Sequence, residues 1–88
     1  MPAATAVVTV RVLAFARLRE LLGFGERLVE VPAASTLDDV WAQVTRDVPA
    51  LQELRASTRF ARNGALAGAG APVANGDEIA LLPPVGGG

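Results

Sequence analysis

The chain of 88 residues contains no cysteine, no histidine, no tyrosine and no lysine. Without cysteine it can form no disulfide, no thiol nucleophile and no cysteine-ligated metal site. Without histidine it lacks the usual general base near neutral pH and the commonest metal ligand, and no Ser/His/Asp or Cys/His catalytic arrangement can be built. These absences argue against self-contained hydrolytic or metal-dependent catalysis. They favour a chain that lends a group to the active site of another protein.

Charge and hydropathy narrow the range of partners. The net charge is −1 and the isoelectric point is about 5.2, while the eight basic residues, all arginine, are scattered along the chain. Nucleic-acid binding through a basic patch is therefore disfavoured. No stretch approaches the roughly 20 apolar residues that span a bilayer, and the N-terminus lacks the pattern of a signal peptide. We expect a cytoplasmic protein that binds neither nucleic acid nor membrane.

The N-terminal third predicts two strands around a short helix. Val7–Leu13 alternates apolar and polar residues, which is typical of a strand with one face on a core. Ala16–Leu22 then predicts a short helix that ends at Gly23, where a left-handed residue is expected. Glu26–Val31 alternates again and predicts the second strand. The short connection favours antiparallel pairing of the two strands.

The strongest helix signal follows. Thr36 is a good N-cap, and Asp39 three residues later can complete a capping box. Helical spacing then places one apolar stripe along the helix, which Pro49 is expected to stop; its members are Leu37, Val40, Trp41, Val44 and Val48. We predict that Trp41 is an anchor of the core.

The remaining chain predicts short elements. Leu51–Leu54 is expected to form a single turn, and Arg59–Arg62 a strand. Asn63-Gly64 is a strong two-residue hairpin signal that leads into Ala65–Ala67. Glu78–Leu82 is the expected final strand and runs directly into the C-terminal residues.

This order of elements predicts an α+β domain of the β-grasp (ubiquitin-like) type. The expected architecture is a mixed sheet of about five strands, one main crossing helix and a short helix after the first strand. The first and last strands should be parallel at the centre, because the helix supplies the long crossover. We expect a single domain over residues 1–88, with an ordered core over about 6–84 and an extended tail over 83–88. Periodicity alone leaves a ferredoxin-like domain as an alternative, since it cannot fix the strand order.

The C-terminal end is unusual. Proline favours extended backbone, so Pro83 and Pro84 should carry the chain out of the fold. The residues from Pro83 to Gly88 can reach roughly 20 Å. Glycine has no Cβ, which makes Gly86–Gly88 the thinnest peptide that can enter a narrow channel. The only charge on this arm is the terminal carboxylate. A terminal glycine run alone also fits an idle tail.

Three segments together resemble the MoaD family. Leu13–Glu20 contains Phe-Ala-Arg-Leu-Arg-Glu and resembles the family motif FAxLRE, and Asn75–Val85 resembles GDEVAxxPPV. Gly87-Gly88 matches the family's terminal pair. The resemblance covers the chain from Val8 to Gly88. One departure is Gly86, where the family usually has Ser, Thr or Ala.

The resemblance implies the small, non-catalytic sulfur-carrier subunit of molybdopterin synthase. In that family, a ubiquitin-activating-like adenylyltransferase uses ATP to adenylate the C-terminal glycine, and a sulfurtransferase supplies sulfur to give a thiocarboxylate. The large synthase subunit then accepts the tail, and the sulfur attacks cyclic pyranopterin monophosphate. The synthase would be a heterotetramer of two small and two large subunits. No metal and no permanently bound cofactor is expected in the small subunit.

The same resemblance assigns candidate site residues. Gly88 carries the carboxylate that becomes the mixed anhydride with AMP and then the thiocarboxylate, and Gly87 gives it clearance. Four tail residues should occupy the partner's channel, namely Pro83, Pro84, Val85 and Gly86. Apolar side chains on the sheet would dock on the large subunit, and by position the candidates are Leu66, Leu82 and Phe60. Core packing is the alternative role of these three.

Other functions share these features. The chain could carry sulfur for thiamin synthesis or tRNA thiolation, with the same chemistry at Gly88. It could be a ubiquitin-like modifier that Gly88 joins to lysines of target proteins. It could also be a plain binding module whose tail is idle.

Overall fold

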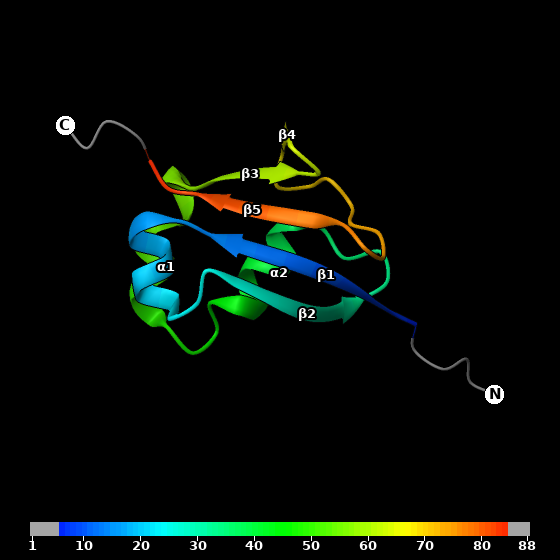
Figure 1. The fold of residues 1–88 in the computed structure, drawn as a ribbon, viewed down its shortest axis with the longest axis horizontal. Coiled ribbons are helices and arrows are strands. Elements are labelled where there is room, and N and C mark those ends of the chain that lie inside the picture. The colour runs from blue at the N-terminus through cyan, green and yellow to red at the C-terminus, as the bar shows by residue number, and fades with distance from the viewer. Residues whose placement is uncertain (1–5, 85–88) are drawn as a thin grey trace.

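One mixed sheet of five strands organises the chain, in the order β2-β1-β5-β3-β4 (Figure 1). In this computed structural model, which describes residues 6–84, β1 (Val7–Ala14) and β5 (Glu78–Leu82) pair in parallel at the centre. β2 (Glu26–Pro32) pairs antiparallel with β1 and forms one edge. β3 (Arg59–Arg62) pairs antiparallel with β5, and β4 (Ala65–Ala67) forms the other edge. The order confirms the predicted β-grasp fold over the ferredoxin-like alternative.

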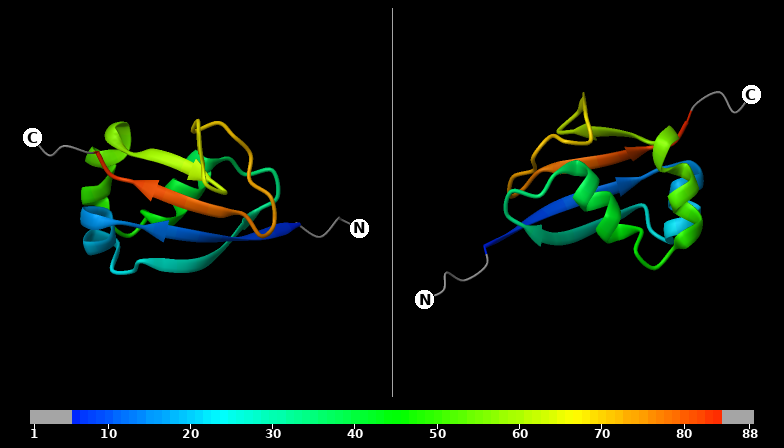
Figure 2. Two further views of the ribbon diagram at one scale, coloured as in Figure 1. Left: turned by 45° about the horizontal axis from the view of Figure 1, so that its top comes forward. Right: turned by 180° about the vertical axis from the view of Figure 1, so that it is seen from behind.

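Three helical segments accompany the sheet. α2 (Leu37–Val44) crosses one face of the sheet, as the rear view in Figure 2 shows, and leaves open the opposite face, which is seen in Figure 1. α1 (Ala16–Leu22) and the 3-10 helix η1 (Pro49–Ser57) lie at the end of the sheet where β1 and β5 terminate (Figure 1). None of the helices within residues 6–84 has the length and apolar character needed to cross a membrane.

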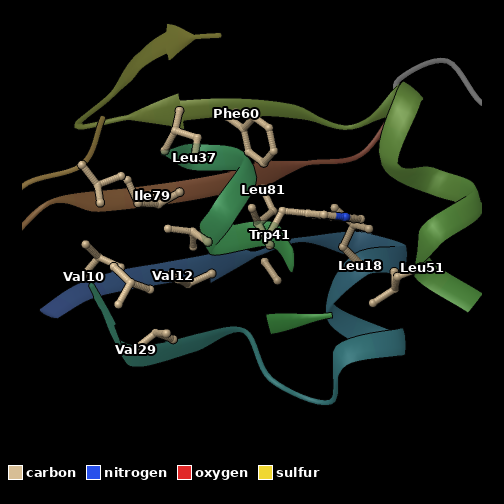
Figure 3. Packing of buried hydrophobic residues seen from close by; sticks show 14 residues of the cluster. Val10, Val12, Leu18, Val29, Leu37, Trp41, Leu51, Phe60, Ile79 and Leu81 are labelled. Carbon is tan, nitrogen blue, oxygen red and sulfur yellow. The ribbon is translucent and has the colours of Figure 1, made fainter. Parts of the chain in front are cut away.

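The core lies between the sheet and the helices (Figure 3). Alternate residues of β1 point into it, so Val10 and Val12 are fully buried, as their spacing predicts. Trp41 of α2 is 2% exposed and meets the ring of Phe60 edge-on, with ring centroids 6.4 Å apart. Its role as a core anchor is confirmed. The remaining buried apolar residues are Ala14, Leu18, Val29, Val31, Leu37, Val40, Leu51, Val73, Ile79 and Leu81.

Local sequence signals fix the ends of the elements as predicted. Thr36 Oγ1 accepts a hydrogen bond from the Asp39 backbone N–H, and an Asp39 carboxylate oxygen accepts one from the Thr36 N–H, which completes the capping box. Gly23 ends α1 with a φ of 84° in the left-handed region. Asn63 and Gly64 have φ values of 52° and 87°, and these positive values build the tight turn between β3 and β4.

Two predicted boundaries are wrong. α2 ends at Val44 rather than continuing toward Val48, because Thr45 leaves the helical conformation and its hydroxyl donates back to the Trp41 carbonyl. Val48 nevertheless packs against the core, because the following turn brings it back. The single turn expected at Leu51–Leu54 is instead the longer η1, which begins at Pro49.

Candidate functional site

The base of the C-terminal arm is held on both sides by neighbouring strands. β5 is the central strand, so Leu81 pairs with Ala14 of β1 and Leu82 pairs with Arg59 of β3. The chain leaves the sheet at Pro83 and Pro84, at the end shared with α1 and η1 (Figure 1). A strand clamped between two others is a firm support for an extended peptide.

Asp77 secures the other end of β5. Its carboxylate accepts hydrogen bonds from Arg62 Nε at 2.7 Å, Asn63 Nδ2 at 2.9 Å and the Ala74 backbone N–H at 2.7 Å. Burial by itself raises the pKa of Asp77, but these three hydrogen bonds and the Arg62 charge outweigh it. The pKa of this carboxyl is therefore held below its ordinary value. The turn before β5 is fixed by a charged network.

The two proline residues lie beside the predicted docking leucines. Leu66, Leu82, Pro83 and Pro84 line one groove of about 480 Å³, whose wall also includes Arg59 and the end of η1. Residues far apart in the sequence thus meet at the base of the arm. The structure brings together four of the predicted site residues.

A row of apolar residues crosses the open face of the sheet toward the same groove. Leu13 of β1 is in register with Ala80 of β5, Ala80 with Ala61 of β3, and Ala61 with Leu66 of β4. Residues in register share a face, and this face is the one that α2 leaves open. Leu66 is 65% exposed. We use the name apolar row for these four residues together with Leu82, which lies on the same face.

The far part of the open face is charged instead. Arg11 forms ion pairs with Glu26 of β2, at 3.4 Å, and with Glu78 of β5. These two carboxylates raise the pKa of the Arg11 guanidinium, and the hydrogen bond that Arg11 donates to Glu78 contributes most. The open face therefore has an ion-paired region away from the arm, where Leu28 of β2 is also exposed, and an apolar region beside the arm.

Phe15 is an exposed aromatic residue at the same end of the sheet, although the sequence does not single it out for docking. It precedes α1 directly at the end of β1, and its side chain is 45% exposed. Because β1 and β5 are parallel, with Ala14 opposite Leu81, Phe15 lies at the end of the sheet from which the arm leaves. Its place in the Phe-Ala-Arg-Leu-Arg-Glu segment was the available signal, but the sequence could not show that the ring is exposed.

Phe60 is placed differently from Leu66 and Leu82. It is 3% exposed, stacks against Trp41 and lies under the guanidinium of Arg55, 4.8 Å from the ring centroid. Its side chain belongs to the core, on the face covered by α2, and has little surface to offer a partner. We therefore leave it out of the docking surface.

The predicted reactive end of the chain lies outside the described residues. This applies to the predicted roles of Val85, Gly86, Gly87 and Gly88. Among residues 6–84, the structure shows no group of three or more side chains that could hold a metal ion. What the described part offers is a strand paired on both sides that leads to Pro83 and Pro84, next to an exposed apolar surface.

Comparison with known proteins places the chain among ubiquitin-like carriers. The model of the ThiS family matches residues 12–88. A molybdopterin synthase sulfur carrier subunit from Arabidopsis thaliana is 34% identical over 84 residues, which covers 96% of this chain and 88% of the relative. These matches confirm the resemblance to the MoaD family.

Two solved structures show the same fold. The small archaeal modifier protein SAMP1 from Haloferax volcanii has a TM-score of 0.78 and 32% identity, covering 91% of this chain and 99% of that one. The complex of subunits 1 and 2 of molybdopterin-converting factor from Helicobacter pylori contains a chain with a TM-score of 0.62 and 27% identity, covering 92% and 100%.

Proposed function

Because the chain belongs to the ThiS family of ubiquitin-like proteins, we propose that it is the sulfur carrier subunit of a molybdopterin synthase, with sulfur carried on Gly88. The observation that best supports this role is the clamped central strand β5, which leads the arm out beside the apolar row. The name of the Arabidopsis relative supports the choice of pathway. The proposed compartment is the cytosol.

Activation of the arm requires a partner. A carboxylate is a poor electrophile, because a nucleophile would have to expel an oxide. In the proposed reaction, a ubiquitin-activating-like enzyme transfers AMP from ATP to the Gly88 carboxylate and releases pyrophosphate. A sulfur nucleophile from a sulfurtransferase then attacks the mixed anhydride, AMP leaves, and a thiocarboxylate remains. The chain itself has no cysteine, histidine or lysine for these steps.

Sulfur transfer takes place in the large subunit. The arm of Pro83, Pro84, Val85, Gly86 and Gly87 enters its active site, and the thiocarboxylate sulfur attacks cyclic pyranopterin monophosphate. Two such transfers build the dithiolene. The proposed assembly has two small and two large subunits. The Helicobacter pylori structure, a complex of two different subunits, supports a large-subunit partner.

Docking on that partner uses the apolar row. Leu66 and Leu82 are the proposed contacts, and Phe15 extends the surface at the end of β1. Burial of apolar surface contributes about 25 cal/mol per Å², so a surface of this kind gives firm but reversible binding. Reversibility matters because the carrier must alternate between its activating enzyme and the synthase.

Protein modification is a second candidate function. The likeness to SAMP1, a protein named as a modifier, favours it. In that case Gly88 would be joined to a lysine of a target protein. Digestion with trypsin would then leave residues 63–88 on that lysine, because Arg62 is the last basic residue of the chain. Sulfur delivery to thiamin synthesis or tRNA thiolation would use the same arm with a different acceptor. Rescue of a strain that lacks molybdoenzyme activity would distinguish molybdopterin synthesis from thiamin synthesis and tRNA thiolation.

The variant Gly88→Ala tests the proposed role of the terminus. A methyl group at the reactive residue should clash with a channel shaped for glycine, so both thiocarboxylate formation and molybdopterin yield should fall strongly. The urea midpoint of unfolding should stay unchanged. Gly70→Ala is the matched control, because a Cβ at Gly70 meets no atom within 4 Å. Normal thiocarboxylate formation and normal molybdopterin yield by Gly88→Ala would count against the proposal.

A further inference from the structure

We propose that Arg59 recognises a carboxylate of the large synthase subunit at the centre of the docking surface. This inference rests on the proposed function and adds a charge contact to an otherwise apolar interface. It assigns to the partner an acidic side chain surrounded by apolar ones, at the position that faces the start of β3.

The position of Arg59 is the first argument. It is the first residue of β3 and is exposed. Its cross-strand partner is Leu82, so the two side chains lie on the same open face. A protein that covers Leu82 and the proline residues must therefore also cover or touch Arg59.

Two grooves meet at this arginine. One is the groove of Leu66, Leu82 and the proline residues, and the other, of about 470 Å³, is lined by residues of β3, β4 and the end of η1. Arg59 and Leu66 line both grooves. Because both residues border both grooves, a partner whose apolar side chains fill the two grooves would enclose the guanidinium.

The charge of Arg59 has no internal partner in the part of the chain that the structure describes. Within residues 6–84, ion pairs are formed by Arg11, Arg55 and Arg62 but not by Arg59. Its neighbour Arg55 is already engaged, since its Nε donates to Asp38 at 2.7 Å and its guanidinium lies over Phe60. Arg59 is therefore an available cation beside an apolar surface.

Enclosing that cation without an acceptor would oppose binding. A charged group that loses its water is strongly disfavoured unless it is paired and hydrogen-bonded. The guanidinium presents a planar fork of donors that matches a carboxylate in two parallel hydrogen bonds. A partner that binds the apolar row tightly should therefore place a carboxylate against Arg59. A partner with a basic group there would be repelled, so this contact also selects the partner.

The test compares charge reversals at two arginines. The full chain carrying Arg59→Glu, Arg59→Lys or Arg46→Glu is titrated into the large subunit of the same organism, and Kd and the association rate are measured at two salt concentrations. Arg46→Glu is the matched control, because Arg46 lies in a different groove, between α2 and β2, and changes the net charge equally. Urea midpoints of all variants should match the wild type.

We expect Arg59→Glu to weaken binding by at least about tenfold and to reduce its salt dependence, with Arg59→Lys retaining part of the affinity. Arg46→Glu should bind like the wild type. Reversing the facing carboxylate of the large subunit to lysine should restore binding to Arg59→Glu. If all variants bind equally, or if Arg59→Glu and Arg46→Glu weaken binding equally, the inference about Arg59 is overturned. Binding of the wild-type chain would still support the proposed function in that case. Absence of wild-type binding would refute the proposed function, and this inference with it.

Discussion

Replacing Asp77 with asparagine removes the charge from the network that fixes the start of β5. The carboxylate accepts three hydrogen bonds, two on Oδ2, from Arg62 Nε and the Ala74 N–H, and one on Oδ1, from Asn63 Nδ2. Asparagine has only one acceptor oxygen in its side chain. Its NH₂ group would therefore face either the Asn63 donor or the Arg62 and Ala74 donors, and those hydrogen bonds would be lost. Hydrogen bonds to charged groups contribute about 1.5–3 kcal/mol. The half-exposed pair with Arg62 adds about 0–1 kcal/mol.

We therefore expect Asp77→Asn to lower the free energy of unfolding by about 2–3 kcal/mol at pH 7. For a domain of this size that corresponds to a fall in Tm of roughly 10–20 °C. The pH dependence gives a second signature. The pKa of Asp77 is lower in the folded state than in the unfolded state, so its contribution is fully present above the unfolded value of about 3.9 and is lost as the pH falls through the folded value.

Urea unfolding followed by Trp41 fluorescence measures both effects, since Trp41 is the single tryptophan and is buried. Asp47→Asn is the control, because Asp47 is exposed and takes part in no ion pair among residues 6–84. Its effect should stay within about 0.5 kcal/mol. The reasoning is refuted if Asp77→Asn is as stable as the control, or if its deficit does not shrink as the pH falls below the unfolded pKa of about 3.9.

Removing the hydroxyl in Thr36→Ala breaks the capping box and should cost about 1 kcal/mol in urea unfolding. An unchanged midpoint would show that the carbonyls of Ala69 and Ala71, which accept hydrogen bonds from the first N–H groups of α2, hold its start alone. Leu81→Ala should lose about 2–5 kcal/mol, because Leu81 is fully buried. Leu66→Ala should lose less than about 0.5 kcal/mol yet bind the large subunit more weakly. Equal stability losses for the two leucine variants would contradict the assignment of Leu66 to a docking surface.

Much of the fold could be predicted from local rules. The alternation in β1, the capping box at Thr36 and the Asn63-Gly64 turn are short-range signals, and each is confirmed. The end of α2 could not be predicted from the apolar stripe. The stripe shows that Val48 reaches the core, but either a helix or a turn can bring it there. In the sequence pattern Pro49 indicates the end of a helix, but proline also favours the first turn of the next helix, which here is η1.

The candidate site was predicted less completely, because exposure depends on tertiary structure. Leu66 and Leu82 are both apolar in sequence, and only the register of β3, β4 and β5 shows that they share the open face. The same register buries Phe60 and leaves Arg59 exposed. Phe15 was missed because a residue that follows a strand and precedes a helix has no periodicity to indicate which way it faces.

The most direct test of the central claim is the intact mass of the full chain after incubation with its activating enzyme, ATP and a sulfur source. The account predicts replacement of one carboxylate oxygen by sulfur, located at Gly88 by fragmentation of the C-terminal peptide. It also predicts loss of that sulfur when the large subunit and cyclic pyranopterin monophosphate are added. A terminus that stays an ordinary carboxylate under these conditions, or that appears only joined to lysines of other proteins, would contradict the account.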